Sequence, residues 1–139
     1  MARLIRLLRY LVVRALAGKH YIAEIARMYF VDNESPGSIA AVFGLSKQSV
    51  RGYIQRVEEM CGGFRRARAL VRLVTDEVMK VRSIFVKRDD GFLECSVCGY
   101  ITRYPERHVE RAHPEIVETE VSRIIEALRS RVELSGGGG

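Results

Sequence analysis

Two cysteines and two histidines have the types and spacing of metal ligands. Cys95, Cys98, His108 and His113 follow one another with two, nine and four residues between them. Two thiolates on a tight turn and two imidazoles on a helix supply the four ligands of a tetrahedral Zn²⁺ site. Because the protein would fill all four positions, no water would remain for activation, so we expect one Zn²⁺ in a structural role. The alternative is that these residues bind no metal and are simply surface thiols and solvated histidines. The short spacing between them disfavours this alternative.

The segment around these ligands, about residues 92–115, resembles a zinc finger of the two-cysteine, two-histidine type. The resemblance implies a small ββα-like module. DNA-reading fingers usually place about twelve residues between the inner ligands, whereas this chain has nine. The usual base-reading positions would fall on Ile101, Tyr104 and Arg107, of which only Arg107 is a natural reader. Pro105 predicts that the finger helix begins there. We therefore favour a stabilising or protein-contact role for the module over direct DNA contact.

Other catalytic signatures are absent from the sequence. It has no phosphate-binding loop, no His-Glu-x-x-His and no serine between the glycines of a nucleophile elbow. The remaining histidine, His20, is expected at a helix start near the surface. Cys61, which stands alone beside a glycine pair, is expected to be a semi-buried apolar residue. We expect no enzymatic activity.

A second pattern lies between residues 39 and 57. Gly44 can end a helix in the left-handed conformation, and Ser46 can cap the next helix with its hydroxyl. Ala40 is small enough for close contact between the two helices. One buried stripe along the second helix is predicted from apolar residues at spacings of three and four: Val50, Tyr53, Ile54 and Val57. The pattern predicts two helices joined by a tight turn.

This pattern resembles the helix-turn-helix of DNA-binding regulators, which implies binding to double-stranded DNA. We assign adenine recognition to Gln48 through its amide, and contact with guanine or a phosphate to Arg51. The other expected DNA-contacting residues are Ser46, Lys47, Ser49, Gln55 and Arg56, with Arg65, Arg66 and Arg68 extending the electrostatic footprint. The alternative is an ordinary helical hairpin with solvated charges.

Charge is distributed unevenly over the 139 residues. Residues 1–80 hold 14 Lys and Arg against 7 Asp and Glu, whereas residues 81–139 hold 9 against 10. A surface that binds a polyanion should therefore lie in the first half, which also contains the helix-turn-helix. A membrane surface is the other polyanion considered. Arginines within the apolar N-terminal stretch argue against a signal peptide, and no segment is long enough to span a bilayer. We expect no membrane association and a cytoplasmic location.

The expected fold is mainly α. Residues 1–88 should form the helical helix-turn-helix domain with a long helix, residues 89–134 a zinc module with a C-terminal helix, and residues 135–139 a disordered tail. The predicted helices are Arg3–Ala17, Lys19–Val31, a third ending at Gly44, Ser46–Met60, Phe64–Phe85 and a last one from Pro114. The long helix has an apolar seam at every third or fourth residue, which suits either a scaffold for the first four helices or a homodimer interface.

These features together predict a sequence-specific DNA-binding protein, most simply a transcription regulator. The combination of helix-turn-helix and finger is similar in arrangement to small regulators of archaea and their viruses. Two alternatives remain open: a protein-interaction adaptor that uses the finger and the last helix, and a DNA-binding accessory of a recombination system. A homodimer on the DNA is expected, and a protein partner of the zinc module is considered.

Overall fold

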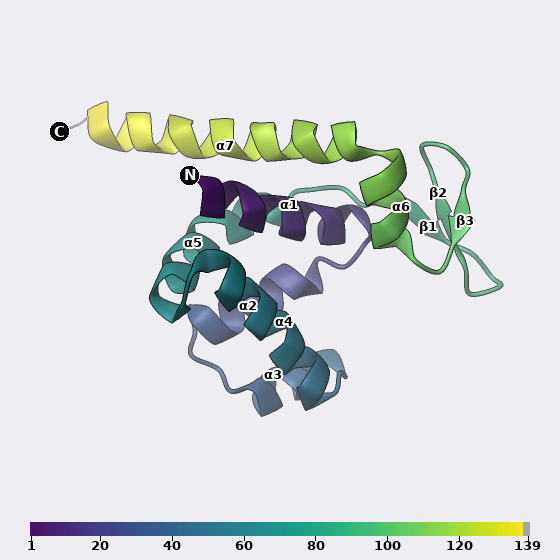
Figure 1. The fold of residues 1–139 in the computed structure, drawn as a ribbon, viewed down its shortest axis with the longest axis horizontal. Helices are drawn as coiled ribbons and strands as arrows, with labels where there is room; N and C mark the ends of the chain where they lie inside the picture. The colour runs from purple at the N-terminus through teal and green to yellow at the C-terminus, as the bar shows by residue number, and fades with distance from the viewer. Residues whose placement is uncertain (138–139) are drawn as a thin grey trace.

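The computed structural model describes residues 1–137 and is mainly helical, with one small antiparallel sheet (Figure 1). The helices of this described part are α1 (Ala2–Leu16), α2 (Tyr21–Phe30), α3 (Pro36–Phe43), α4 (Lys47–Cys61), α5 (Phe64–Val78), α6 (Pro105–Ala112) and α7 (Pro114–Gly137). The strands are β1 (Phe85–Lys87), β2 (Leu93–Cys95) and β3 (Ile101–Thr102). The expected fold class, a helical domain with a helix-turn-helix and a small metal-ligand module, is confirmed.

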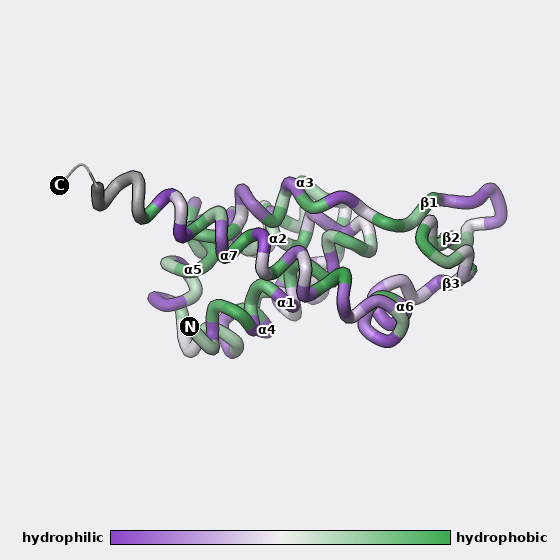
Figure 2. Tube along the Cα trace, turned by 90° about the horizontal axis from the view of Figure 1, so that it is seen from above, coloured by the Kyte–Doolittle hydropathy of each residue, from purple (hydrophilic) through white to green (hydrophobic). Residues whose placement is uncertain are grey.

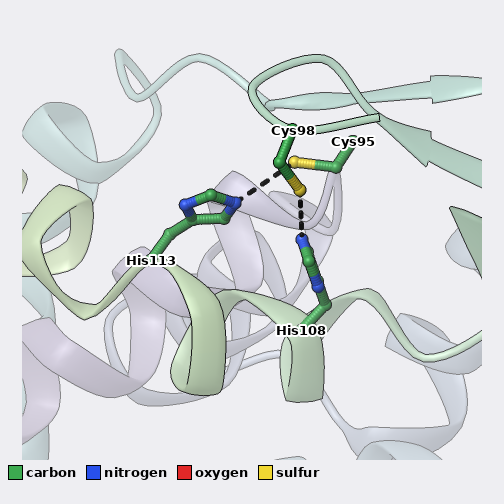
Figure 3. Close-up of side chains that lie close together, drawn as sticks. All are labelled: Cys95, Cys98, His108 and His113. Atoms are coloured by element: carbon green, nitrogen blue, oxygen red, sulfur yellow. Dashed lines mark hydrogen bonds between the residues drawn. The ribbon is translucent and has the colours of Figure 1, made fainter. Parts of the chain in front are cut away.

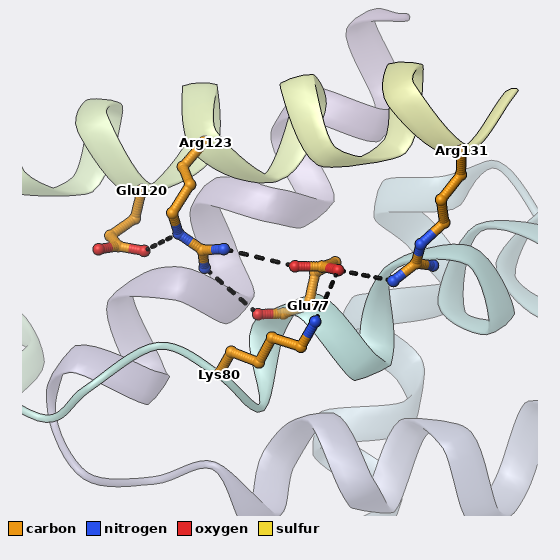
Figure 4. Close-up of polar contacts among 5 residues, drawn as sticks. All are labelled: Glu77, Lys80, Glu120, Arg123 and Arg131. Carbon is orange, nitrogen blue, oxygen red and sulfur yellow. Dashed lines mark hydrogen bonds and ion pairs between the residues drawn. The ribbon is translucent and has the colours of Figure 1, made fainter. Parts of the chain in front are cut away.

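Helix α1 lies at the centre of the body, with α2, α4 and α5 on one side and α7 on the other (Figure 1). Its burial follows from its sequence, because Leu7, Leu8 and Leu11 recur at helical spacing and are at most 1% exposed. Arg9 remains on the surface and pairs with Glu118 of α7, with 2.6 Å between Nε and Oε1. A second polar contact joins α5 to α7 at Glu77 (Figure 4).

Helix α5 ends at Val78, seven residues before the predicted end at Phe85. The apolar spacing continues through Val81, but that residue is buried from a segment outside any helix or strand. Two hydrogen bonds hold this segment against the end of α1: the Ile84 amide donates to the Leu16 carbonyl at 2.9 Å, and the Ser83 hydroxyl donates to the same oxygen at 3.2 Å. Phe85 then begins β1, where β-branched and aromatic residues favour a strand. The predicted long helix is therefore too long.

The apolar seam of α5 is buried within the chain. Ala67, Val71, Val74 and Val78 are fully buried and belong to the same core as α1, α2 and α7. The seam therefore serves as the scaffold considered from the sequence. The surface on which the homodimer is predicted is occupied by the chain's own helices.

The three strands form an antiparallel sheet in the order β1-β2-β3, with Phe85 opposite Cys95 and Glu94 opposite Ile101. Strand β1 begins before the predicted boundary at residue 89, so the sheet takes its first strand from the segment assigned to the helical domain. The sheet lies at the end of the molecule opposite the C-terminus in two perpendicular views, and a hydrophilic hairpin tip projects from it (Figure 2). Val109 and Val117, which follow the sheet, join the helical core.

The last helix continues to Gly137 and so includes three residues of the predicted tail, whose last residues, 138 and 139, lie outside the described part of the chain. None of the described helices combines the length and the apolar character needed to cross a membrane.

Candidate metal centre and nucleic-acid interface

Cys95 is the last residue of β2, and Cys98 lies on the tight turn that leads from it to β3. The Gly99 amide donates to the Cys95 carbonyl, and the Cys95 amide donates to the Tyr100 carbonyl, each at 2.8 Å. Gly99 has φ 79°, a left-handed conformation that a residue with a Cβ rarely adopts. This turn brings the Cys98 thiol back towards the Cys95 thiol.

The two histidines come from α6 and its end. Pro105 occupies the first turn of the helix, as predicted, and His108 follows within it. Five residues along an α-helix rotate a side chain well away from the starting face. His113 leaves the helical conformation, with φ −131° and ψ 45° at the C-cap. That departure allows both imidazoles to face the cysteine turn.

The four predicted ligands meet at one point (Figure 3). Cys95 Sγ lies 3.5 Å from His113 Nε2, Cys98 Sγ lies 3.2 Å from His108 Nε2, and all four ligand atoms lie within 4.8 Å of one another. Ligand atoms about 3.5 Å apart are expected around a tetrahedral ion bound at 2.0–2.3 Å. The cluster can therefore hold one metal ion.

The surroundings of the cluster orient its imidazoles. Tyr100 stacks on His108 at 4.6 Å between centroids, and Phe85 of β1 contacts the same ring edge-on at 5.9 Å. Burial, and then the neighbouring His113, lower the pKa of His108 and favour the neutral form that binds metals. His113 is 6% exposed, and its Nδ1 lies 3.7 Å from a carboxylate oxygen of Glu115. Carboxylates beside the second ring nitrogen commonly orient metal-binding histidines.

Cys61 lies outside this cluster. It is fully buried at the end of α4, and burial raises the pKa of its thiol to about 11. The thiol therefore stays protonated at neutral pH and is a poor metal ligand. This agrees with its expected role as an apolar residue, although its burial is complete.

Helices α3 and α4 form the helix-turn-helix with the expected local geometry. Gly44 has φ 65°, and the Leu45 amide donates to the Ala40 carbonyl at 3.0 Å across the turn. The Ser46 hydroxyl caps α4 by accepting from the Ser49 amide at 3.0 Å. Within α4, Val50 and Ile54 are buried as predicted, whereas Tyr53 is half-buried.

The predicted DNA-contacting residues of α4 and its cap are all exposed: Ser46, Lys47, Gln48, Ser49, Arg51, Gln55 and Arg56. At 100° per residue, Gln48, Gly52 and Gln55 lie opposite the buried stripe. Ser49 and Arg56 lie on one flank of that face, and the other flank carries Lys47 and Arg51. The Gln55 amide donates to Glu59 at 3.0 Å, so it is already engaged within the helix.

Arg65, Arg66 and Arg68 are exposed on the first turns of α5. They follow the C-terminal end of α4, about 20 Å along its axis from Lys47. Glu58 and Glu59 lie between the two groups in the sequence. The structure therefore does not bring these three arginines together with the N-terminal residues of α4.

Several residues near the two candidate sites were not identified from the sequence. Tyr100 and Glu115 support the metal ligands, and the available signal was their position in the sequence, two residues after Cys98 and two residues after His113. Arg14 of α1 and Arg111 of α6 share a groove with Arg56. Only the packing of α4 and α6 against α1 reveals this groove, because its residues are distant in sequence.

Comparisons of the chain with protein-family models, curated proteins and solved structures found no match. The geometry of the metal-ligand cluster and the exposed face of α4 therefore carry the proposals about function.

Proposed function

We propose that this chain binds double-stranded DNA in a sequence-specific manner as a transcription regulator, with α4 entering the major groove. The observation that carries this proposal is α4 itself. A buried stripe at Val50, Ile54 and Val57 fixes the helix against the body, and the opposite face with its two flanks exposes amide, hydroxyl and guanidinium groups. Recognition helices contact base edges with their N-terminal residues.

The side chains of α4 have distinct roles in this proposal. Gln48 contacts adenine with its amide, and Arg51 contacts guanine or a phosphate. Ser46 donates its hydroxyl proton to the Ser49 oxygen at 2.8 Å, which leaves the Ser49 hydroxyl proton for a phosphate. Lys47 and Gln55 are assigned to phosphates, with Gln55 the weaker of the two because Glu59 accepts from its amide.

We also propose that the ion held by the cluster is Zn²⁺ and that its role is structural. Two thiolates and two imidazoles are typical of structural zinc sites, and all four positions come from the protein. The strands beside the site contain only two or three residues each, so apolar burial alone gives this module little stability. Metal binding then supplies the folding free energy of the module.

A symmetric dimer on DNA belongs to the same proposal. One helix-turn-helix contacts few base pairs, and a dimer contacts two half-sites. It requires a surface other than the buried seam of α5. Light scattering at micromolar concentration, with zinc present, tests this part. We expect twice the 15.8 kDa mass of one chain, and the mass of a single chain would exclude a dimer in the absence of DNA.

A protein-interaction adaptor is the second candidate function, favoured by one specific observation. Apolar side chains of the metal-ligand module are unusually exposed: Val86 58%, Val97 53%, Tyr100 56%, Ile101 43% and Tyr104 68%. Exposed apolar groups of this kind are found at protein interfaces. In this alternative the basic first half of the chain has no nucleic-acid partner.

Selection of bound duplexes from a random DNA pool, followed by affinity measurements at several salt concentrations, tests the proposed function. We expect an enriched sequence and an affinity that falls steeply with salt, because phosphate contacts release counterions. A pool without enrichment, together with weak and salt-insensitive DNA binding, would favour the adaptor.

A further inference from the structure

A groove of about 540 Å³ separates the recognition helix from the metal-ligand module. Its lining includes Arg14 of α1, Tyr53 and Arg56 of α4, and Arg107 and Arg111 of α6. Helix α6 lies beside the C-terminal end of α1, at the same end of the molecule as the strands (Figure 1). The groove therefore joins the helix-turn-helix to the module that contains the metal ligands.

The charge of this groove is positive after its ion pairs are considered. Its four arginines face two carboxylates, Glu106 and Glu110. Glu106 already pairs with Lys19, and Arg14 lies over the ring of Tyr10 at 3.7 Å. Among side chains 1–132, which the structure describes, the ion pairs include none with Arg56, Arg107 or Arg111. Unpaired guanidinium groups in a concave surface attract an anion.

The groove continues into two smaller hollows that share its residues. A hollow of about 280 Å³ over α4 is lined by Ser49, Gly52, Tyr53 and Arg56. Another, of about 440 Å³ at the metal-ligand module, again includes Arg107 and Arg111. The three hollows form a strip from the exposed face of α4 to the module, which we call the α4–α6 strip. It follows the flank of α4 that carries Ser49 and Arg56.

The open backbone at Gly52 is the second notable feature of this strip. A Cβ built there would meet no atom within 4 Å, so packing within the protein does not require glycine. Glycine within a helix lowers helix stability relative to alanine. Its advantage is the close approach of another molecule to the helix backbone. The position lies one turn after Gln48, where the proposed DNA would lie closest.

We propose that the α4–α6 strip binds the phosphodiester backbone of the duplex read by α4, with Arg56, Arg107 and Arg111 as the phosphate ligands. This inference rests on the proposed function. A helix in the major groove has one strand backbone along each flank. Lys47 and Arg51 face one backbone, and the strip faces the other. The planar guanidinium fork fits phosphate oxygens in a bidentate manner.

The metal-ligand cluster controls half of this binding surface. Arg107 immediately precedes the ligand His108, and Arg111 lies between His108 and His113 on the same helix. Metal binding fixes α6, and so holds both guanidinium groups over the groove. The module therefore acts as a second clamp on the DNA rather than as a reader of bases.

The test measures binding of the selected duplex and of a scrambled duplex by fluorescence anisotropy at several salt concentrations, with zinc-loaded protein. Arg56→Ala and the double change Arg107→Ala with Arg111→Ala should weaken both duplexes by the same factor. The slope of log affinity against log salt should fall by about 1 for each phosphate that the variant no longer binds. The matched control for Arg56→Ala is Arg129→Ala on α7, which likewise removes one positive charge but on the far side of α1 from α4, and it should change neither quantity. Zinc content and circular dichroism check that each variant is folded.

Chelation provides a second readout. Removing the metal should weaken the unmodified protein about as much as the double change does, and should weaken the double variant little further. The inference is overturned if the double variant keeps the affinity and salt slope of Arg129→Ala while Gln48→Ala still loses sequence preference. The proposed function then survives. Absence of salt-dependent duplex binding by the unmodified protein overturns both.

Discussion

The carboxylate of Glu77 on α5 accepts a hydrogen bond from the guanidinium of Arg131 on α7, with 2.6 Å between Oε1 and Nη2. Glu77 is 4% exposed, and the same carboxylate pairs with Lys80 at 3.1 Å and with Arg123 at 3.4 Å (Figure 4). A buried carboxylate without partners would be costly, whereas three cations around it satisfy its charge. This cluster fixes the last helix on the helical body.

The Glu77 cluster gives a pH-dependent prediction. Burial raises the pKa of Glu77, but the hydrogen bond and charge of Lys80, the charge of Arg131 and the hydrogen bond from Arg123 outweigh it, so the pKa lies below its ordinary 4.5. Because the pKa is lowered in the folded state, the ionised Glu77 contributes fully to the free energy of unfolding above about pH 4.5. This contribution is lost as the pH falls through the lower pKa of the folded state. Glu77→Gln should therefore reduce the free energy of unfolding by roughly 1–2 kcal/mol at pH 7 and by less at pH 3.

Urea denaturation of both proteins at the two pH values measures this difference. The metal-ligand cluster is the same in both proteins, so the difference between them reports Glu77. Glu120→Gln is the matched control and should cost less, because Glu120 is more exposed and, among side chains 1–132, its ion pair is with Arg123 alone. Equal losses for Glu77→Gln at pH 7 and pH 3 would contradict the assignment of the stabilisation to charge.

The metal proposal predicts one zinc per chain by elemental analysis, lost in Cys98→Ser. Removing the metal should disorder the three strands and α6, because the strands bury only the ligand Cys95 and α6 adds only Pro105 and Val109. Helix α7 should stay on the body through Arg9 and Glu118 and through the Glu77 cluster. Amide hydrogen exchange with and without chelator measures which segments lose protection.

A thiol reagent supplies the control for this prediction. Cys95 and Cys98 should react only after chelation, whereas Cys61, fully buried with a pKa of about 11, should react only when the protein unfolds. A chain free of metal that keeps its strands protected would show that the metal is not needed for folding of the module.

The helix-turn-helix and the metal ligands were predictable because their signals are local. Gly44 and Ser46 lie beside the backbone that they shape, and the four ligands are separated by short, fixed spacings. The end of α5 was not predictable in this way, because Val81 and Phe85 continue a helical spacing. They leave the helix because the segment between them bonds to Leu16, far away in the sequence. Apolar spacing records which residues are buried, not the backbone conformation from which they are buried.

The α4–α6 strip could not be predicted from the sequence for the same physical reason. Arg56 and Arg111 are far apart in the chain, and only the packing of α6 beside α1 places them on one groove. The metal-ligand module also has nearly equal numbers of positive and negative residues, so its composition did not indicate a positive surface. Glu106 is paired with Lys19, so the module presents more positive charge to the groove than its composition suggests.

Base readout by α4 gives the third prediction. Gln48→Ala should lower affinity for the selected duplex by about 1–3 kcal/mol and relax preference at one position, because its amide contacts a base edge. Gln55→Ala is the matched control, since its amide already donates to Glu59, and its effect should be smaller. Repeating the selection with each variant measures the preference. Equal losses on selected and scrambled duplexes for Gln48→Ala would assign it to the phosphate backbone instead.

The last prediction separates stability from binding at one position. Gly52→Ala should raise the free energy of unfolding by roughly 0.5–1 kcal/mol, because alanine favours the helix and no atom lies within 4 Å of the added methyl group. The same methyl group projects from the face opposite the buried stripe, where the proposed DNA approaches the helix backbone. It should therefore lower the affinity for the duplex.

Gly37→Ala is the control, because this glycine of α3 also has no atom within 4 Å of a Cβ. It should raise stability and leave DNA binding unchanged. Thermal unfolding and anisotropy on the same samples measure both quantities. A Gly52→Ala protein that is more stable and binds DNA as tightly as before would contradict the close approach of DNA at this helix.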